Sequence, residues 1–468
     1  MESTRITEVI DEAVQRPLPE DVLAMARRTL LNVTGTAIGA ARHPAVDAIT
    51  AGSTGSARVP GRGGRVAPVD AALATGTAAH LDDFDDTHLA TVIHPGAACL
   101  GALAALEPEA GAASATEVLT AYAWGCELQL RLGMAVSPSH YDLGWHITGT
   151  CGAFGAAATS ALLLGLRGHR LATALSWGIC RGLGTREGFG TMTKPFHAGK
   201  AAANGVLAAR LAAADAPAPP VGTALDGFVR RLTREFDEEA FLGGLNGPGG
   251  PGSSGTCEAT GSGNGTGTGT GTGCRFELRR NTFKPYPCGI VTHPAIEAAE
   301  HLAASVRDAG GPDAVTDVAL HCHPLVPELT GNADPFDGLQ ARFSTVHGVA
   351  AGLLLGVVDL GAYEDGFVRS EAMKQLRAKV RLLASPERDR AEAGIQVTTS
   401  GSETLRHHVP AARGSEQQPM TDADLRTKVS RLVEPVLPGR TGAVTEAVAA
   451  DGPGYLTTLM TACAEEEN

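Results

Sequence analysis

One segment divides this sequence into two parts with different periodicities. Residues 247–274, GPGGPGSSGTCEATGSGNGTGTGTGTGC, carry glycine at nearly every second position and offer almost no side chain to bury. We expect this segment to be a flexible insertion in a surface loop. Apolar residues recur with a helical period before it, and strand-like alternation follows it. The sequence therefore predicts two folded parts of different structural class.

The part before the insertion is predicted to be helical throughout. Residues 20–40 begin with acidic side chains and carry an apolar stripe near the 3.6-residue period, formed by Val22, Leu23, Ala26, Leu30, Leu31 and Val33. Similar patterns occupy residues 95–106, 115–131, 149–166 and 198–213. Glycine and alanine dominate residues 149–166, so neighbouring backbones can approach this helix closely and it should be buried on most sides. We predict a helical domain over residues 1–246.

The part after the insertion mixes strands and helices. Alternating stretches at residues 274–283, 314–324, 379–385 and 394–410 are interleaved with helical patterns at 293–306 and 343–358. This predicts an α+β domain over residues 275–413. Residues 421–437 return to a helical pattern, with Thr421 and Asp424 forming a capping-box-like start. The tail, residues 414–468, is expected to pack back on the helical domain, which gives a fold that is mainly α with a smaller α+β part.

Composition excludes several classes of partner. The net charge of −13 leaves no basic stripe to neutralise phosphates, so no nucleic-acid partner is expected. The N-terminus has no basic region followed by an apolar stretch, and no window holds about 18 consecutive apolar residues. We therefore expect a cytoplasmic protein without membrane association. The nine cysteines are scattered and never form a CxxC pair, so neither a zinc site nor an iron–sulfur cluster is expected.

The stretch HLDDFDDTHLATVIHPG, residues 80–96, concentrates acids and imidazoles. Its DDxxD spacing is the one by which helical prenyl-diphosphate enzymes bind magnesium, but the aromatic content of 4% is low for a carbocation cavity. A charge run most often belongs to a solvated acidic loop. We favour a third interpretation, because His94, Pro95 and Gly96 open a small-residue helix. A helix N-terminus beside acids and imidazoles can bind and protonate an anion without metal.

Three further stretches share this chemistry. His146 directly precedes a Gly/Ala helix, and Lys194, His197 and Lys200 stand at the start of another helix. Lys284 lies in a turn forced by two prolines, with His293 beyond it. Taken singly, each histidine is more often a structural residue. Their repetition at loops that end in helix N-termini predicts one shared pocket for carboxylates.

These residues carry a resemblance to a known family. The pieces LDDFDDTHLATVIHPGA, GWHITGTCGAFGAAA, KPFHAGKAAANGVLAARLA, KPYPCGIVTHPAIEAA and ARFSTVHGVAAGLLLG, in this order, resemble the MmgE/PrpD family. That family includes 2-methylcitrate dehydratase, cis-aconitate decarboxylase and iminodisuccinate epimerase. The resemblance runs from about residue 5 to 465, apart from the glycine-rich insertion. It implies a helical domain, an α+β lid, an active site between them, and a homodimer.

The resemblance also assigns site residues. Positions that match the pocket of cis-aconitate decarboxylase, and that we predict to be catalytic, are Asp83, Thr87, His94, His146 and Lys194. Lys284 matches a lysine that lines the substrate site, and we expect His197 and His293 to bind substrate with it. The chain departs from the decarboxylase at Gly289, where the family member has a histidine. Either His293 substitutes from the next turn or the step that needs this group is absent, which favours a dehydratase.

We therefore expect a lyase that needs no cofactor or metal and dehydrates a hydroxylated di- or tricarboxylate of the 2-methylcitrate type. Lys194 and Lys284 would hold carboxylates, and one histidine would take the proton α to a carboxylate. The other histidine, or Asp83 with a pKa raised by burial, would protonate the leaving hydroxyl. Asp85 and Asp86 would then cap helices and fix histidine tautomers. A decarboxylase of the cis-aconitate type and an epimerase or isomerase at the α carbon are the alternatives.

Overall fold

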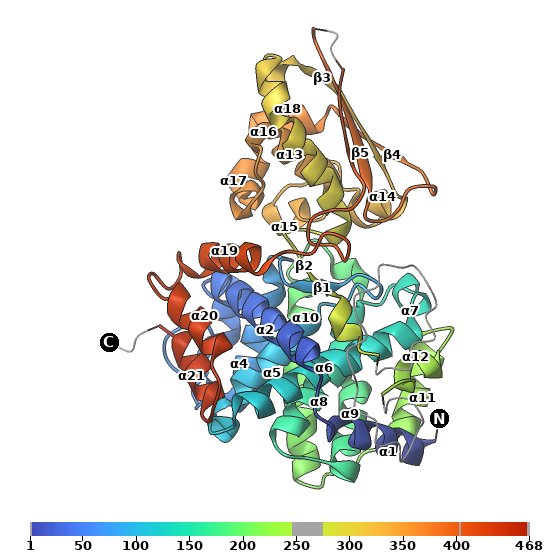
Figure 1. Ribbon diagram of the computed structural model, residues 1–468, viewed down its shortest axis with the longest axis vertical. Helices are drawn as coiled ribbons and strands as arrows, with labels where there is room; N and C mark the ends of the chain where they lie inside the picture. Colours follow the sequence, from blue (N-terminus) through green and yellow to red (C-terminus); the bar gives the residue numbers. More distant parts are fainter. Residues whose placement is uncertain (1, 246–274, 402–403, 466–468) are drawn as a thin grey trace.

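The computed structural model describes residues 2–245, 275–401 and 404–465. The predicted flexible insertion, residues 247–274, lies outside the described residues. Figure 1 shows a large helical body with a smaller α+β domain beside it. This arrangement confirms the fold class, which is mainly α with an α+β part. Among the described residues, no helix combines the length and the apolarity needed to cross a membrane.

The helical body contains the first twelve helices and the last three. They are α1 (Ser3–Val14), α2 (Glu20–Gly39), α3 (Pro44–Thr50), α4 (Pro68–Leu81), α5 (Pro95–Ala110), α6 (Ala115–Val136), α7 (Ser139–Asp142), α8 (Ile147–Leu163), α9 (Gly168–Arg181), α10 (Thr193–Ala213), α11 (Val221–Leu232), α12 (Glu238–Leu242), α19 (Asp422–Val433), α20 (Thr441–Ala449) and α21 (Tyr455–Ala462). One hydrophobic core draws side chains from both groups of helices.

Helix α8 lies at the centre of this body, in contact with α5, α6, α9 and α10. Its residues 147–162 are all buried, as the Gly/Ala-rich sequence predicts. Glycines make the close approach possible, because a Cβ at Gly205 of α10 would overlap Ala156 of α8. A Cβ at Gly199 would likewise overlap the carbonyl oxygen of Leu73 in α4. These tight contacts fix where α8 and α10 begin, which matters for the site.

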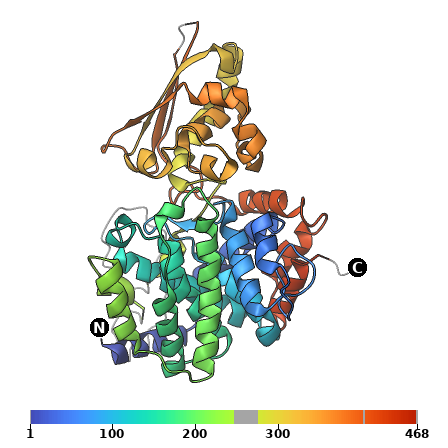
Figure 2. The same ribbon diagram turned by 180° about the vertical axis from the view of Figure 1, so that it is seen from behind.

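The C-terminal helices α19, α20 and α21 pack beside α2 and α5 (Figures 1 and 2). Helix α19 begins with the predicted capping box between Thr421 and Asp424. It sends the buried Lys428 inward, where the Nζ atom donates to the carbonyl oxygens of Phe84, at 2.6 Å, and Lys284, at 2.8 Å. Lys428 therefore ties together two loops that carry site residues.

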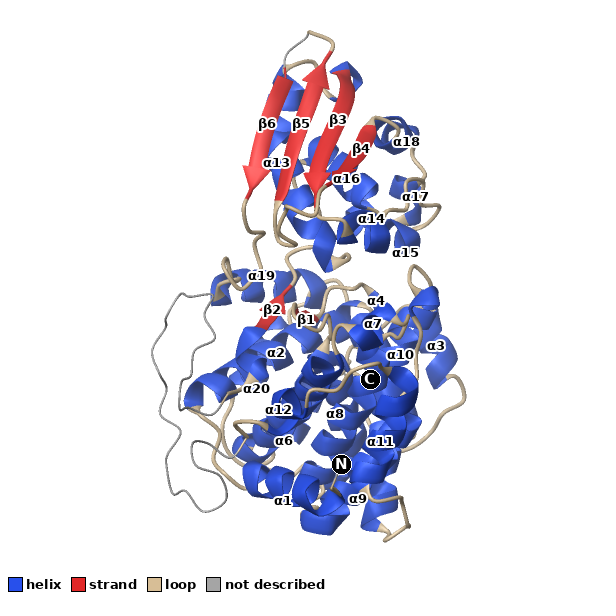
Figure 3. Ribbon diagram, turned by 90° about the vertical axis from the view of Figure 1, so that its right-hand side faces the viewer, coloured by secondary structure: helices blue, strands red, loops and turns tan. Residues whose placement is uncertain are grey.

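The small domain comprises α13 (His293–Asp308), α14 (Leu325–Thr330), α15 (Gly338–Ala341), α16 (Thr345–Leu355), α17 (Asp365–Val368), α18 (Glu371–Arg377), β3 (Val315–Cys322), β4 (Val380–Ala384), β5 (Ala393–Thr399) and β6 (Thr404–Val409). Its sheet has the order β4-β3-β5-β6, with β3 and β4 parallel and the other pairs antiparallel. Helices α13 and α16 cover one face (Figure 3). Burial alternates along β5, as expected for a sheet with one covered face.

A two-stranded antiparallel sheet joins the helical body to the segment that leads into the small domain. Strand β1 (Asp86–His88) pairs with β2 (Asn281–Phe283), which places Asp86 opposite Phe283. The strand predicted over residues 274–283 is wrong for most of its length, because residues Glu277–Arg280 form the short helix η2. The backbone N–H groups of Glu277 and Leu278 donate to the buried Glu127 carboxylate instead of to a neighbouring strand.

Candidate active site

A pocket with about 480 Å³ of atom-free space lies where the helical body meets the small domain. Six of the eight residues predicted from the sequence line it: Asp83, Thr87, His94, His146, Lys194 and Lys284. They come from loops that are far apart in the chain. The sequence predicts that these loops form one site because they carry similar side chains, and the fold brings them together.

Three helices of the body begin at this pocket. His94 is the N-cap residue of α5, His146 is the N-cap residue of α8, and Lys194 is the second residue of α10. The backbone N–H of His94 donates to Thr148 Oγ1 at 3.2 Å, which joins the first turns of α5 and α8. Helix N-termini carry partial positive charge, so this convergence favours an anionic ligand.

Asp83 stands at the centre of the charged groups. Its backbone adopts the left-handed region, with φ of 49°, and its side chain is buried. The Oδ1 atom lies 2.6 Å from Lys194 Nζ and 3.0 Å from Lys284 Nζ. Lys284 Nζ also donates to the carbonyl oxygens of Asp83 and Cys288. One carboxylate oxygen therefore holds two buried ammonium groups side by side.

This geometry corrects the acid role expected for Asp83. Burial alone would raise its pKa, but the ammonium groups of Lys194 and Lys284 outweigh burial and hold the pKa well below its ordinary value. The raised pKa belongs to Asp86 instead, where burial and the neighbouring Asp85 carboxylate bring it to about 7. Asp83 is thus an ionised anchor for the two lysines.

Asp86 does not line the pocket. Its Oδ2 atom accepts hydrogen bonds from the backbone N–H of Gly96 at 3.1 Å and from Asn281 Nδ2 at 2.7 Å. It therefore fixes the first turn of α5, which is the helix-capping role expected for it from the sequence.

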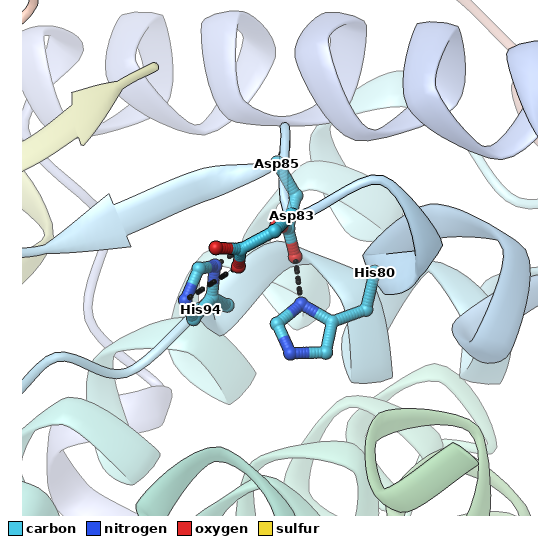
Figure 4. A group of neighbouring side chains, drawn as sticks. All are labelled: His80, Asp83, Asp85 and His94. Carbon is cyan, nitrogen blue, oxygen red and sulfur yellow. Dashed lines mark hydrogen bonds and ion pairs between the residues drawn. The ribbon is translucent and has the colours of Figure 1, made fainter. Parts of the chain in front are cut away.

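Asp85 joins two imidazoles, as Figure 4 shows. Its Oδ2 atom lies 2.8 Å from His80 Nδ1, and its Oδ1 atom lies 2.9 Å from His94 Nδ1. Because an ionised carboxylate only accepts hydrogen bonds, both Nδ1 atoms carry the proton and both Nε2 atoms carry a lone pair. His80 uses that lone pair to accept from Lys194 Nζ at 3.0 Å. His94 Nε2 lies 3.7 Å from Asp83 Oδ1.

Both predicted catalytic histidines are held neutral. Burial lowers the pKa of His94 to about 3; the Asp85 carboxylate opposes this effect, and the positive charge of Lys284 adds to it. Burial and the ammonium of Lys194 hold the pKa of His146 well below its ordinary value. Among the described residues, His146 Nε2 has no hydrogen-bond partner. The pocket thus contains two neutral imidazoles that can accept a proton.

The carboxylates do not suit a metal ion. Ligand atoms of His80, Asp83, Asp85 and His94 lie within 4.8 Å of one another, but each of these side chains is already engaged with a neighbouring imidazole, carboxylate or ammonium group. Two ammonium groups on Asp83 Oδ1 would also repel a dication.

The three carboxylates of the DDxxD spacing have different partners and do not converge on one point, as the ligands of a magnesium site of this type would. Asp82 instead pairs with Arg342 at 2.6 Å, away from the partners of Asp83 and Asp86. The stretch is not a solvated loop either, because Asp83, Asp85 and Asp86 are buried. Of the three interpretations of this sequence, the structure fits the one in which acids and imidazoles surround a helix N-terminus.

His197 and His293, the two remaining predicted substrate-binding residues, lie outside the pocket lining. His197 stands behind His146, with 3.1 Å between their Nδ1 atoms. His293 Nε2 lies 3.3 Å from the carbonyl oxygen of Cys288, and its side chain lines a separate, larger groove. Gly289 itself lines the pocket, so no imidazole stands at that place in the described structure.

Several residues at the pocket were not predicted from the sequence. They are His80, behind the pocket, and the lining residues Tyr141, Phe189, Thr330 and Phe343. The Nζ atom of Lys194 lies 5.5 Å from the ring centre of Phe189 and 5.4 Å from that of Phe343. His80 stands in the acidic stretch and could have been predicted from its position. The aromatic residues carry no comparable signal, because single apolar residues are common everywhere.

Comparison with known proteins decides the family. The model of the MmgE/PrpD N-terminal domain matches residues 4–239, and that of the MmgE/PrpD C-terminal domain matches residues 286–451. The chain belongs to the MmgE/PrpD family. This confirms the resemblance carried by the motifs.

Relatives of this MmgE/PrpD protein include cis-aconitate decarboxylases. The Mus musculus enzyme is 27% identical over 380 residues, which cover 78% of this chain and 71% of the relative. The Homo sapiens enzyme is 26% identical over 377 residues, with coverage of 78% and 72%. The Aspergillus terreus enzyme is 28% identical over 247 residues, about half of each chain. Decarboxylases of this kind are lyases, so the similarity supports a lyase.

Proposed function

We propose that this protein is a lyase that removes the proton next to a carboxylate and dehydrates a hydroxylated carboxylic acid. One observation carries the proposal: two buried lysine ammonium groups share Asp83 Oδ1 beside the neutral imidazole of His94, which Asp85 orients. This arrangement supplies positive charge for a carboxylate and a base for the adjacent C–H bond.

Substrate binding would use the two lysines and the helix N-termini. A substrate carboxylate that approaches Lys194 and Lys284 meets two point charges that are already held in place. Asp83 keeps both ammonium groups oriented, so little reorganisation is needed when the ligand arrives. The same groups would stabilise the negative charge that grows on the carboxylate as the proton leaves.

His94 is the better candidate for the base. Its tautomer is fixed by Asp85, so its Nε2 lone pair is available in the pocket, and the carboxylate stabilises the imidazolium that forms. The α C–H bond then breaks, its electrons enter the carboxylate, and an enediolate-like state forms beside the lysines. His146 is the second base in reach of the pocket.

Lys194 is the candidate acid for the leaving hydroxyl. Burial lowers its pKa, although the Asp83 carboxylate opposes this effect. As the double bond forms and the C–O bond breaks, the ammonium gives its proton to the departing oxygen, which leaves as water. His94 is then an imidazolium and Lys194 an amine, and both return to their starting states by proton exchange with water. Lys194 thus takes the acid role that the sequence suggested for Asp83.

Decarboxylation is the second candidate, because the mouse and human relatives are cis-aconitate decarboxylases. The lysines would stabilise the same kind of charge after loss of carbon dioxide, and a protonated histidine would then quench it. Gly289 argues against this candidate, since the described pocket has no imidazole at that place.

The test is an NMR assay in D2O of EDTA-treated protein with 2-methylcitrate, citrate, cis-aconitate and a set of hydroxy-diacids. New vinyl proton signals from a hydroxy acid are expected for the dehydratase. Loss of carbon dioxide from cis-aconitate would support the decarboxylase, and deuterium incorporation without a new double bond would support an epimerase. Activity that disappears with EDTA would contradict a metal-free mechanism.

We also propose the homodimer that the family resemblance implies. Light scattering is expected to give twice the chain mass of 47.9 kDa, and the mass of a single chain would contradict this.

A further inference from the structure

The His80 side chain lies behind the pocket and connects two of its reactive groups. It is buried and does not line the pocket, so it does not contact a substrate there. Its Nδ1 atom lies 2.8 Å from Asp85 Oδ2, and its Nε2 atom lies 3.0 Å from Lys194 Nζ. The other oxygen of Asp85 holds His94. One carboxylate therefore reaches the candidate base directly and the candidate acid through His80.

The backbone fixes His80 relative to Lys194. His80 belongs to the last turn of α4, and Lys194 belongs to the first turn of α10. These helices approach each other closely, because a Cβ at Gly76 would lie 2.8 Å from Gly199 Cα. The His80 ring is also held from the side, with its centre 4.4 Å from the ring centre of His94. The place of the Nε2 atom is thus set by the fold before a ligand arrives.

The proton positions follow from the acceptors. Burial would raise the pKa of Asp85, but the neighbouring imidazoles of His80 and His94 outweigh burial and lower it. The ionised carboxylate only accepts hydrogen bonds, so His80 carries its proton on Nδ1 and a lone pair on Nε2. An ammonium group has three N–H donors. Lys194 directs one at Asp83 Oδ1 and one at His80 Nε2, which leaves the third for a ligand in the pocket.

The chain of contacts from His94 to Lys194 does not conduct a proton. Both oxygen atoms of Asp85 accept from an Nδ1–H group. A proton that an imidazolium at His94 released to Asp85 could not move on to His80, because Nδ1 of His80 already carries one. The contact between His80 and Lys194 therefore orients the ammonium group, and Lys194 regains its proton from water.

We propose that His80 is a positioning residue, which directs the third N–H of Lys194 at the leaving hydroxyl of the substrate. Through His80, Asp85 orients the acid as well as the base. This role rests on the proposed function and specifies how Lys194 takes part in it. Without the Nε2 acceptor the ammonium can turn away from the hydroxyl, and a misplacement of about 1 Å at a reacting group can lower a rate about 100-fold.

Two substitutions separate the two hydrogen bonds of His80. In His80→Asn the amide can still donate to Asp85 but does not reach Lys194, whereas in His80→Gln the amide oxygen can replace Nε2 as the acceptor. We expect kcat to fall on the order of 30-fold in His80→Asn with KM changed by less than about threefold, and to fall less than about fivefold in His80→Gln. Steady-state kinetics gives the rates, and thermal unfolding compares the stability of the variants. Equal losses in both variants would show that the imidazole only fills space.

The titration of Lys194 in the free protein gives a readout that needs no substrate. A hydrogen bond from the ammonium to Nε2 favours the charged form, so its loss should lower the pKa of Lys194. We expect a decrease of about one pH unit in His80→Asn and of less than about 0.3 unit in His80→Gln. The other titratable groups that act on Lys194 are the same in all three proteins, namely Asp83, Asp85, Lys284, His146 and His197.

Carbon NMR of protein with labelled lysine follows this titration at the Cε atom, and the signal is assigned by its absence from Lys194→Met. The same titration curve in the parent protein and in His80→Asn would contradict the role of His80.

The unmodified protein allows a check that no folding defect can affect. Nitrogen NMR of labelled histidine, assigned with His80→Gln, should show the His80 proton on Nδ1 and the lone pair on Nε2. A proton on Nε2 would leave Lys194 without this acceptor and would overturn the role.

These outcomes also separate the two proposals. If a hydroxy acid is dehydrated in the D2O assay while Lys194 titrates alike in all three proteins, the function stands and the role of His80 is wrong. If the tautomer and the titrations are as expected but no acid is dehydrated, the proposed function is wrong and the positioning of Lys194 by His80 stands.

Discussion

The helical body and the small domain contribute to the same pocket in different ways. The body supplies Asp83, His94, His146 and Lys194, all of them buried and linked through hydrogen bonds to further buried groups. The small domain supplies Ile290, Val291, Leu329 and Phe343, whose side chains are apolar. Lys284 stands in the connection between the two parts.

This difference indicates how one scaffold can change its substrate without changing its chemistry. The charged network depends on many mutual contacts, so a change at one position disturbs the others. The apolar wall formed by Ile290, Val291, Leu329 and Phe343 depends on shape alone. Hydrophobic residues of similar size can replace one another there at a low cost in stability. We therefore expect substitutions in the body to lower kcat and substitutions in the small domain to change KM.

The largest effect is expected for His94→Asn. Removing the base should lower kcat on the order of 10³-fold, since general-base catalysis contributes factors in this range. The exposed His169→Asn is the matched control and should retain full activity. Steady-state kinetics checks the rates, and circular dichroism checks that both variants are folded. An unchanged kcat in His94→Asn would remove this residue from the chemistry.

Asp85→Asn should have the next largest effect. The amide can no longer stabilise the imidazolium of His94, and its NH₂ group can hold the ring in the wrong tautomer. We expect kcat to fall about 100-fold with KM changed by less than about threefold. Asp82→Asn, whose parent residue pairs with Arg342 outside the network, should lose far less. Equal losses in the two variants would show that the Asp85 effect is structural.

Stability should decrease in acid because several histidines are buried in neutral form. Burial lowers the pKa of His94 and His293 to about 3 and of His140 and His197 to about 4. The unfolded chain, with histidine pKa near 6.5, binds more protons than the folded chain below that pH. Asp86 and Glu300 oppose this trend, because burial raises the pKa of both carboxyl groups.

The melting temperature should therefore fall continuously from about pH 6.5 to about pH 4, as measured by differential scanning calorimetry. A melting temperature that stays constant over this range would mean that these imidazoles are not buried as described.

The smallest effect is expected for Gly289→Ala, on the apolar side. The new Cβ would lie 2.9 Å from Thr330 Cγ2, so the wall must shift slightly. We expect KM to rise about threefold while kcat changes by less than about twofold. Adding Thr330→Ser removes the contacting methyl group and should restore KM. A large fall in kcat would mean that this wall takes part in the chemistry, against the division described here.

The charged part of the site could be predicted from the sequence, because a His or Lys at the start of a helix can be recognised from a short stretch of residues. The ionisation of Asp83 could not, since it depends on Lys194 and Lys284, which are 111 and 201 positions away. Nearby acids suggested a raised pKa, which the structure shows at Asp86. The position of His293 also could not be predicted, because it depends on a contact with the Cys288 carbonyl oxygen that the sequence does not reveal.

Most of the fold was predictable from periodicity alone. Helices α2, α8 and α13 follow the apolar patterns within a few residues, and β3 and β4 follow the alternation. Two exceptions are strand β1 (Asp86–His88), which lies in the part predicted to be helical throughout, and residues Glu277–Arg280, where long-range hydrogen bonds to Glu127 replace strand pairing. Such contacts leave no local sequence pattern.

The most direct test is proton NMR in D2O with the EDTA-treated protein and its His94→Asn variant, using 2-methylcitrate, citrate and a set of hydroxy-diacids. Our account predicts that the parent protein consumes the α-proton signal and produces a vinyl signal, and that the variant does so on the order of 10³-fold more slowly. Equal rates in the two proteins, or activity that requires added metal, would contradict it.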